Sequence, residues 1–206
     1  GTLETFCDGG DGFVVTWYDQ SGNDNHATQS TAASQPKIVD SGVVYLTNSK
    51  PSIYFNGNSI NASLGIAIDG CSFYCLLTQI SYLSDFPTQL DFGNFYVHAP
   101  YDSTKSYYSI RPDVRSNPDV TLNSQHLLFW SDTKAFATLH NNSVLKATYT
   151  EGSAPSQFQQ IFIGSGSNLA NFVNGYYQEV VLYPSDQSAN RTGIEGNIDA
   201  YYNILS

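Results

Sequence analysis

The stretch that decides the fold runs from Trp17 to Gln29 and reads WYDQSGNDNHATQ. Its aromatic start is typical of a β-strand, and the polar residues that follow are turn formers. An aspartate at a strand end can accept hydrogen bonds from backbone amides two residues further on, and glycine adopts a positive φ without strain. We therefore expect Asp19 to hold a stiff turn around Gly22, between the two strands of a hairpin.

A calcium site is the alternative role for this turn. Carboxylate, amide and backbone carbonyl oxygens are the ligands that Ca²⁺ prefers, and the turn carries such groups at Asp19, Asn23, Asp24 and Asn25. The turn lacks, however, the several carboxylates of a self-sufficient site. A structural calcium ion is therefore kept as the second interpretation, and no other cofactor is expected.

Short β-type segments fill most of the chain on either side of this turn. Apolar, aromatic and β-branched runs alternate with clusters of turn formers, and many short strands with few helices are typical of a sandwich or jelly roll. Asn141 and Asn142 indicate a tight hairpin. We predict an all-β, two-sheet antiparallel jelly-roll sandwich with strands at residues 13–18, 36–39, 43–46, 52–55, 72–80, 95–98, 126–131, 134–140, 143–148, 159–163 and 176–183.

One helix is expected, near the C-terminus, where Ile194, Ile198 and Leu205 recur at helical spacing. Asp186 or Ser188 is available as its N-cap. Residues 100–123 contain three prolines and little alternation, so we expect a long loop there, of the kind that is commonly functional. Without a linker or an internal repeat, residues 1–206 are predicted to form a single domain. The absence of Met predicts that this domain was cut or processed from a longer chain.

Composition excludes two classes of partner. Eight Lys and Arg residues stand against eighteen Asp and Glu residues, which gives a formal net charge of −10. A chain of this charge lacks the basic face that binding to nucleic acid or to an anionic membrane surface requires. No apolar run is long enough for membrane insertion. Cys7, Cys71 and Cys75 are odd in number, so at least one is unpaired within the chain. Free thiols and a disulfide from Cys7 both remain open.

Two motifs resemble known jelly rolls. The strand, Asp and Ser-Gly-Asn turn at residues 17–29 resemble the opening hairpin of concanavalin A-like, laminin-G-like domains. The string Tyr-Asp-Gln-Ser-Gly-x-x-Asn-His resembles more closely still the catalytic domain of the α-L-arabinofuranosidase B family. GYYQEV at residues 175–180 and YPSD at residues 183–186 are similar to the last strand of both groups. The resemblance implies a concanavalin A-like fold.

The resemblance does not extend to the catalytic groups. A retaining glycosidase needs two carboxylates about 5 Å apart. In the resembling family the nucleophile comes from an Asp-x-Glu-Asn string and the acid from an Asp after Gly-Gly, beside vicinal cysteines. This chain has no Asp-x-Glu string and no vicinal cysteines, and Ser167 stands where the acid would fall. We expect Glu179 to be a structural ion-pair or hydrogen-bond partner, and we assign no catalytic residue.

A carbohydrate-binding surface needs only a shallow cleft with aromatic platforms and polar partners, because sugar rings lie on aromatic faces while carboxylates and amides meet their hydroxyls. The LDFGN string at residues 90–94, which resembles a family Phe-Asp-Tyr-Gly-Asn string, supplies the polar partners. For each aromatic taken singly, core packing is the alternative role. The predicted ligand-binding residues are Tyr96, His98, Tyr101, Tyr107, Tyr108, Arg111 and Trp130, with Asp91 and Asn94 as polar partners.

These observations favour a non-catalytic carbohydrate-binding or adhesion module that recognises a glycan or glycoprotein at an extracellular, cell or virion surface. One alternative is a structural or assembly domain of a virion or cell-surface protein, and a second is a divergent glycoside hydrolase of the arabinofuranosidase type. Only a dozen residues precede the first motif strand, whereas the resembling domains have an earlier strand. We therefore expect an open N-terminal edge on which a second copy, or a neighbouring domain, can pack.

Overall fold

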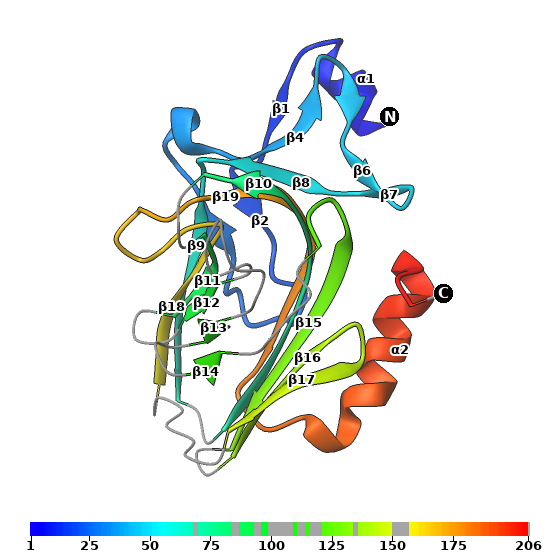
Figure 1. The fold of residues 1–206 in the computed structure, drawn as a ribbon. Helices are drawn as coiled ribbons and strands as arrows, with labels where there is room; N and C mark the ends of the chain where they lie inside the picture. The colour runs from blue at the N-terminus through cyan, green and yellow to red at the C-terminus, as the bar shows by residue number, and fades with distance from the viewer. Residues whose placement is uncertain are drawn as a thin grey trace.

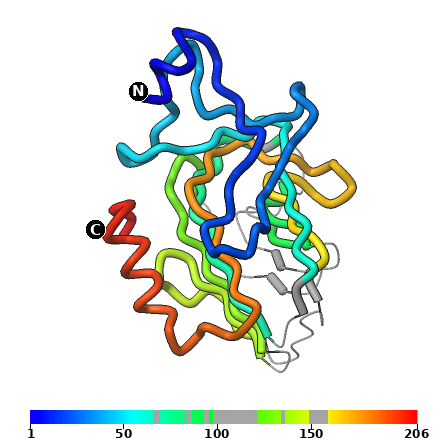
Figure 2. Tube along the Cα trace, turned by 180° about the vertical axis from the view of Figure 1, so that it is seen from behind, coloured from blue at the N-terminus to red at the C-terminus, as the bar shows by residue number. Residues whose placement is uncertain are grey.

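The computed structural model describes residues 1–67, 70–83, 87–92, 96–98, 109–110, 114–115, 121–133, 136–149 and 157–205. Within these ranges the chain forms two facing antiparallel sheets with one longer helix, α2 (Arg191–Tyr202), on an outer face (Figure 1). The predicted jelly-roll sandwich is confirmed. Both views place the two chain ends on the same side of the molecule as α2 (Figures 1 and 2).

The larger sheet has nine strands among the described residues. In spatial order they are β1 (Gly12–Phe13), β4 (Lys37–Asp40), β8 (Ile53–Asn56), β19 (Val173–Tyr183), β10 (Cys71–Tyr82), β15 (Gln125–Asp132), β16 (Ala137–Asn141) and β17 (Val144–Tyr149), with β5 (Val43–Val44) beside β4. A separate hairpin joins β6 (Leu46–Thr47) to β7 (Lys50–Pro51).

The smaller sheet has eight strands in the described part of the chain. In spatial order they are β14 (Val114–Arg115), β13 (Ser109–Ile110), β12 (Tyr96–His98), β11 (Thr88–Asp91), β18 (Gln157–Ile163), β9 (Ile60–Ala67), β3 (Ala27–Thr28) and β2 (Thr16–Trp17). The short helical segments are α1 (Leu3–Cys7), η1 (Ala32–Ser34) and η2 (Ser188–Asn190).

The core lies between the two sheets because alternate residues of each strand point inward. Phe55 on β8 and Tyr177 on β19 meet edge to face, with ring centroids 4.9 Å apart, and both are fully buried. The three cysteines are free in the structure, which selects the free-thiol alternative. Cys75 is completely buried, and burial raises the pKa of its thiol.

Helix α2 packs on the outer face of the larger sheet, where Ile198 joins Tyr74, Leu76 and Phe129 in a second apolar cluster. Glu195 is buried there and accepts from Arg191 Nη1 at 2.5 Å and from Ser143 Oγ at 2.9 Å. None of the described helices has the length and apolar character needed to cross a membrane.

The predicted helix is confirmed, but its ends differ from the expectation. Its N-cap is Asn190, and Asp186 instead accepts from the N–H of Ser188 at 3.0 Å, at the preceding turn η2. At the other end Asn203 adopts a left-handed conformation, with φ 56°. Leu205 therefore lies beyond the helix, with its N–H donated to the carboxylate of Asp199.

Other strand boundaries also differ from the prediction. Residues 13–18 were expected to form one strand, but β1 and β2 belong to different sheets, because the chain crosses between the sheets after Phe13. The hairpin turn is formed by Asn142 and Ser143, both with positive φ, so it lies one residue later than expected. Strand β9 was missed, since its sequence INASLGIA interrupts the apolar pattern with small and polar residues. The expected loop at residues 100–123 includes the short strands β13 and β14.

Candidate functional site

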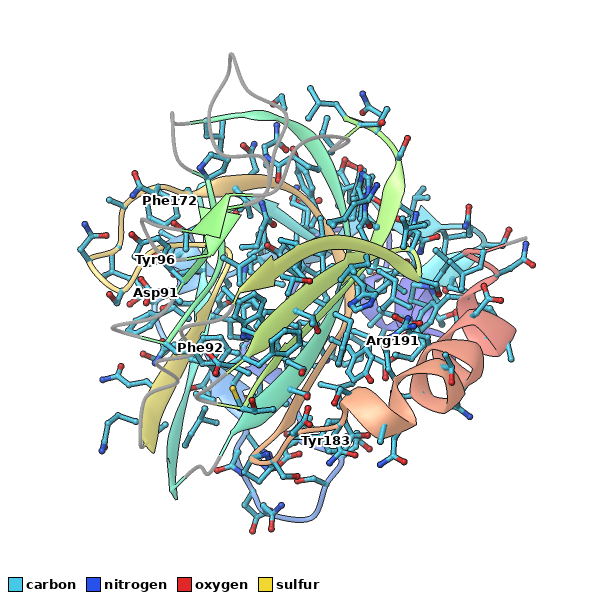
Figure 3. The ribbon with its side chains drawn as sticks, turned by 60° about the horizontal axis from the view of Figure 1, so that its bottom comes forward. Asp91, Phe92, Tyr96, Phe172, Tyr183 and Arg191 are labelled. Atoms are coloured by element: carbon cyan, nitrogen blue, oxygen red, sulfur yellow. The ribbon has the colours of Figure 1, made fainter. Side chains whose placement is uncertain are left out.

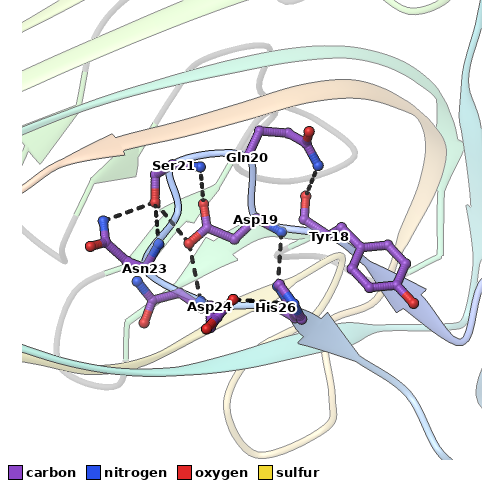
Figure 4. A network of polar contacts seen from close by, with 8 residues as sticks. Tyr18, Asp19, Gln20, Ser21, Asn23, Asp24 and His26 are labelled. Atoms are coloured by element: carbon purple, nitrogen blue, oxygen red, sulfur yellow. Dashed lines mark hydrogen bonds and ion pairs between the residues drawn. The ribbon is translucent and has the colours of Figure 1, made fainter.

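The turn between β2 and β3 is closed by the Asp19 carboxylate, as the sequence predicted (Figure 4). Oδ1 accepts from the N–H of Ser21 at 2.8 Å, and Oδ2 accepts from Ser21 Oγ at 2.8 Å and from the N–H of Asn25 at 3.0 Å. These donors, led by the N–H of Ser21, lower the pKa of Asp19. His26 adds a further bond by accepting from the N–H of Asp19 at 3.2 Å.

This geometry supports the structural role of the turn without requiring a metal ion. Both carboxylate oxygens already accept hydrogen bonds, and the amide of Asn23 donates to Ser21 Oγ at 2.9 Å. In the described ranges no three His, Cys, Asp or Glu side chains gather in a way that could hold a metal ion. Calcium at Asp19, Asn23 and Asn25 is not tested by this observation, since two of those residues are amides.

The carboxylate of Asp91 behaves differently, because it holds a segment that is distant in the sequence. Asp91 ends β11, is 5% exposed, and accepts from the N–H of Ser167 at 2.7 Å. Ser167 lies in the loop at residues 164–172, which is also closed by a bond from the N–H of Gly166 to the carbonyl of Ala170 at 2.8 Å. Gly164 at its start has φ +87°, and a Cβ there would lie 2.5 Å from the ring of Phe55. The two ends of the loop are joined by a bond from the N–H of Val173 to the carbonyl of Gly164 at 3.1 Å.

Tyr96 is the predicted ligand-binding residue that the structure places beside Asp91. The two residues are cross-strand partners in the β11–β12 pair, and Tyr96 is half-buried. Figure 3 shows Tyr96, Asp91 and Phe172 together on one side of the molecule, away from Tyr183 and Arg191 next to α2. Ser167, Asn168 and Leu169 of the adjacent loop are exposed. This end of the smaller sheet therefore combines an aromatic ring with exposed hydroxyl and amide groups.

The remaining predicted residues fall into three groups. Trp130 is 2% exposed and packs in the main core cluster, so it cannot reach a ligand in this structure, and the core role that we considered for it describes it better. His98 pairs through its backbone in β12, but its side chain lies outside the described part. The others lie wholly outside the described residues: Asn94, Tyr101, Tyr107, Tyr108 and Arg111.

Sequence analysis missed a second aromatic group, formed by Tyr45, Tyr54 and Tyr176 on the outer face of the larger sheet. Their ring centroids are 5.1 to 5.5 Å apart, and all three are half-buried. Tyr54 and Tyr176 occupy predicted strands at positions next to the core residues Phe55 and Tyr177, so alternation could have placed them outside. Nothing in the sequence, however, shows that these strands are neighbours.

Glu179 lies beneath α2 and is the glutamate that we expected to be structural. Burial raises the pKa of Glu179, and a hydrogen bond from Tyr202 on the helix opposes that shift. Tyr202 also donates to the carbonyl of Gln178 at 3.2 Å. Glu179 thus lies at a helix–sheet contact, on a different part of the molecule from Asp91 (Figure 1).

The fold is the concanavalin A-like jelly-roll sandwich that the motifs predicted. A GH54 arabinofuranosidase structure soaked with 4-nitrophenyl arabinofuranoside has a TM-score of 0.67 at 15% identity, covering 95% of this chain and 52% of that one. A Bacteroides ovatus protein described as carbohydrate-binding has a TM-score of 0.57 at 14% identity, covering 76% and 53%. A heptameric SAP-like pentraxin from Limulus polyphemus has a TM-score of 0.54 at 8% identity, covering 71% and 82%.

Because the sequence identities are low, these similarities concern the fold alone. No protein-family model matches the chain, and no curated protein matches it by sequence. The chain spans about half the length of the arabinofuranosidase that it resembles. These matches therefore identify the fold of this chain and not the chemistry of its residues.

Proposed function

We propose that this chain is a non-catalytic carbohydrate-binding module and that the end of the smaller sheet around Asp91 and Tyr96 contacts the glycan. The observation that carries the proposal is the 2.7 Å hydrogen bond from the N–H of Ser167 to Asp91, which fixes a polar loop beside an aromatic ring. A ring and hydroxyl or amide groups in a fixed arrangement are what recognition of a sugar requires, because the ring meets its apolar face and the polar groups meet its hydroxyls.

The non-catalytic part of the proposal rests on Ser167. The resemblance implies a catalytic acid at this position, and Ser167 has no carboxyl group to protonate a leaving group. Its backbone N–H is instead used to bind the buried Asp91. A retaining mechanism needs a second carboxylate about 5 Å from the first, and the resemblance supplies none at the corresponding positions of this sequence.

The fold neighbours give independent support for a carbohydrate ligand. A GH54 arabinofuranosidase, which was soaked with an arabinofuranoside, and a Bacteroides ovatus protein described as carbohydrate-binding both share the fold. Because this fold hosts several activities, the likeness supports a ligand class and does not name a sugar.

A glycan array followed by titration calorimetry tests the proposal. We expect at least one neutral oligosaccharide to bind, and Tyr96→Ala to weaken its binding by about 1 kcal/mol or more, as truncation of an aromatic anchor commonly does. Tyr18→Ala is the matched control, because Tyr18 is an exposed tyrosine on the separate Asp19 turn. Equal weakening by both changes, or hydrolysis of a bound oligosaccharide, would contradict the proposal.

A further inference from the structure

The outer face of the larger sheet carries an aromatic surface that lies apart from the Asp91 end. Tyr54 on β8 is the cross-strand partner of both Lys37 on β4 and Tyr176 on β19. Residues that pair directly across antiparallel strands share one face of a sheet. Since the neighbouring residues Phe55 and Tyr177 point into the core, the row of Lys37, Tyr54 and Tyr176 points outward.

Tyr45 completes this surface from the segment that follows β5. Its backbone N–H donates to the carbonyl of Ile38 at 2.9 Å, and its carbonyl accepts from the N–H of Ser52 at 2.9 Å, so the segment is fixed on both sides. The Tyr45 ring lies 5.2 Å from that of Tyr54 and 5.5 Å from that of Tyr176. The rings are tilted by 38 to 56° to one another, and each of the three tyrosines is half-buried.

A charged group borders the three rings. Lys37 Nζ lies 2.9 Å from Asp11 Oδ2 and 3.0 Å from Asp40 Oδ1, and the side chains of Asp11 and Asp40 are 37% and 48% exposed. Asp11 is itself fixed, since its other oxygen accepts from the N–H of Ser41 at 2.9 Å. Burial raises the pKa of Tyr45 and Tyr176, and the nearby negative charge of Asp40 raises both further. The three charges sum to one negative charge.

We propose that Tyr45, Tyr54 and Tyr176, bordered by Asp40 and Lys37, form a second carbohydrate-binding surface that takes neutral glycans. The rings offer faces for the apolar sides of sugar rings, and the fixed carboxylate and ammonium groups offer directional partners for hydroxyls. An acidic sugar is disfavoured, because the ammonium of Lys37 is already compensated by two carboxylates and the chain carries a net charge of −10.

The position of the surface suits a glycan chain better than a single buried sugar. Its residues lie on three strands and one tethered segment of the larger sheet, so the platform is rigid. It is shallow, because the rings are only half-buried. The Asp91 end belongs to the smaller sheet, on the other side of the core (Figure 1), so the two surfaces contact different parts of a ligand or different ligands.

Nuclear magnetic resonance of the whole chain with labelled tyrosine rings tests this surface directly. The probes are a panel of neutral oligosaccharides built from pentoses and from hexoses, with oligogalacturonate as the acidic comparison. We expect neutral members to shift the ring signals of Tyr45, Tyr54 and Tyr176, while the signals of Tyr18 and Tyr201 stay in place. Unchanged signals of all three rings across the panel would overturn the proposal.

Variants give the second readout. Tyr54→Ala and Tyr176→Ala should each weaken the binding of a neutral oligosaccharide roughly five- to tenfold, and Tyr54→Phe should retain most of it if an alanine variant does not fold. Tyr201→Ala is the matched control, because Tyr201 is an exposed tyrosine on α2 whose ring contacts Lys50, with Nζ 3.9 Å from the ring centroid. Asp40→Asn should reduce the preference for neutral over acidic oligosaccharides, and an unchanged preference counts against the surface.

The outcome separates this surface from the Asp91 end. Shifts confined to Tyr96 would leave the proposed function in place and overturn the second surface. Shifts confined to Tyr45, Tyr54 and Tyr176 would do the reverse. A loss of affinity in Tyr201→Ala equal to that in Tyr54→Ala would also overturn it, since general destabilisation would then explain both.

Discussion

Two carboxylates near strand ends of the smaller sheet have different roles: Asp19 lies two residues after β2, and Asp91 is the last residue of β11. Asp19 bonds to residues two and six positions ahead and closes its own turn. Asp91 is buried and bonds to Ser167, 76 residues away, so it joins two segments that are distant in the sequence. A carboxylate bonded within its own turn therefore contributes to stability, whereas a long-range carboxylate can also position a loop for a ligand.

The largest expected effect concerns the core behind Asp91. Phe92 follows Asp91, and its ring centroid lies 5.9 Å from that of Phe73. Phe73 is in turn the cross-strand partner of Trp130. Trp130→Ala should therefore destabilise the fold by about 3 to 5 kcal/mol, as loss of a buried aromatic does, and chemical denaturation measures this. If the variant instead kept near wild-type stability and lost glycan binding, Trp130 would be a ligand-binding residue and not a core residue.

A smaller effect is expected at Asp91 itself. Asp91→Ala leaves the N–H of Ser167 without its acceptor, and loss of one partner of a buried hydrogen bond costs about 1 to 3 kcal/mol. Hydrogen exchange should locate the change in the loop at residues 164–172, with faster exchange of the Ser167 amide. Ser21, whose N–H bonds to Asp19, is the internal control. Faster exchange at Ser21 as well would mean that the two regions are coupled, contrary to the comparison.

The smallest effect is the pH dependence of the Asp19 turn. The folded turn lowers the pKa of Asp19 below 3.8, so the unfolded chain binds the proton more readily. The contribution of this group is therefore present above the unfolded pKa and is lost as the pH falls through the folded one. Thermal melts between pH 5 and 2 should show a shallower loss of stability in Asp19→Asn than in the wild type. If melting temperature fell equally with pH in the two proteins, the charge of Asp19 would not contribute to stability.

Sequence patterns predicted the features that depend on neighbours along the chain. The Asp19 turn follows from a donor two residues ahead, and the sandwich follows from the alternation of apolar residues, which many of the strands carry by themselves. The C-terminal helix follows from the spacing of Ile194 and Ile198. Each of these patterns lies within a short stretch of sequence, so it can be recognised without knowledge of the tertiary contacts.

Features that depend on strand order could not be predicted. The split of residues 13–18 between two sheets is decided by strand pairing, since β1 pairs with β4 in the larger sheet and β2 pairs with β3 in the smaller one. Likewise, the cluster of Tyr45, Tyr54 and Tyr176 exists because β8 and β19 are neighbours, although more than a hundred residues separate them. The bond from Ser167 to Asp91 belongs to the same class. The candidate sites are therefore less predictable from the sequence than the fold.

The most direct test of the central claim measures glycan affinity and melting temperature together, for changes at Asp19 and at tyrosines that the sequence predicts to bind the ligand. We predict that Asp19→Ala lowers the melting temperature and leaves affinity unchanged. Tyr96→Ala, Tyr107→Ala and Tyr108→Ala should weaken binding by about 1 kcal/mol or more and leave the melting temperature nearly unchanged. Titrations with added calcium and with a chelator should agree. If Asp19→Ala instead abolished binding in a calcium-dependent way with stability intact, the ligand site would belong to the turn, and the account would be wrong.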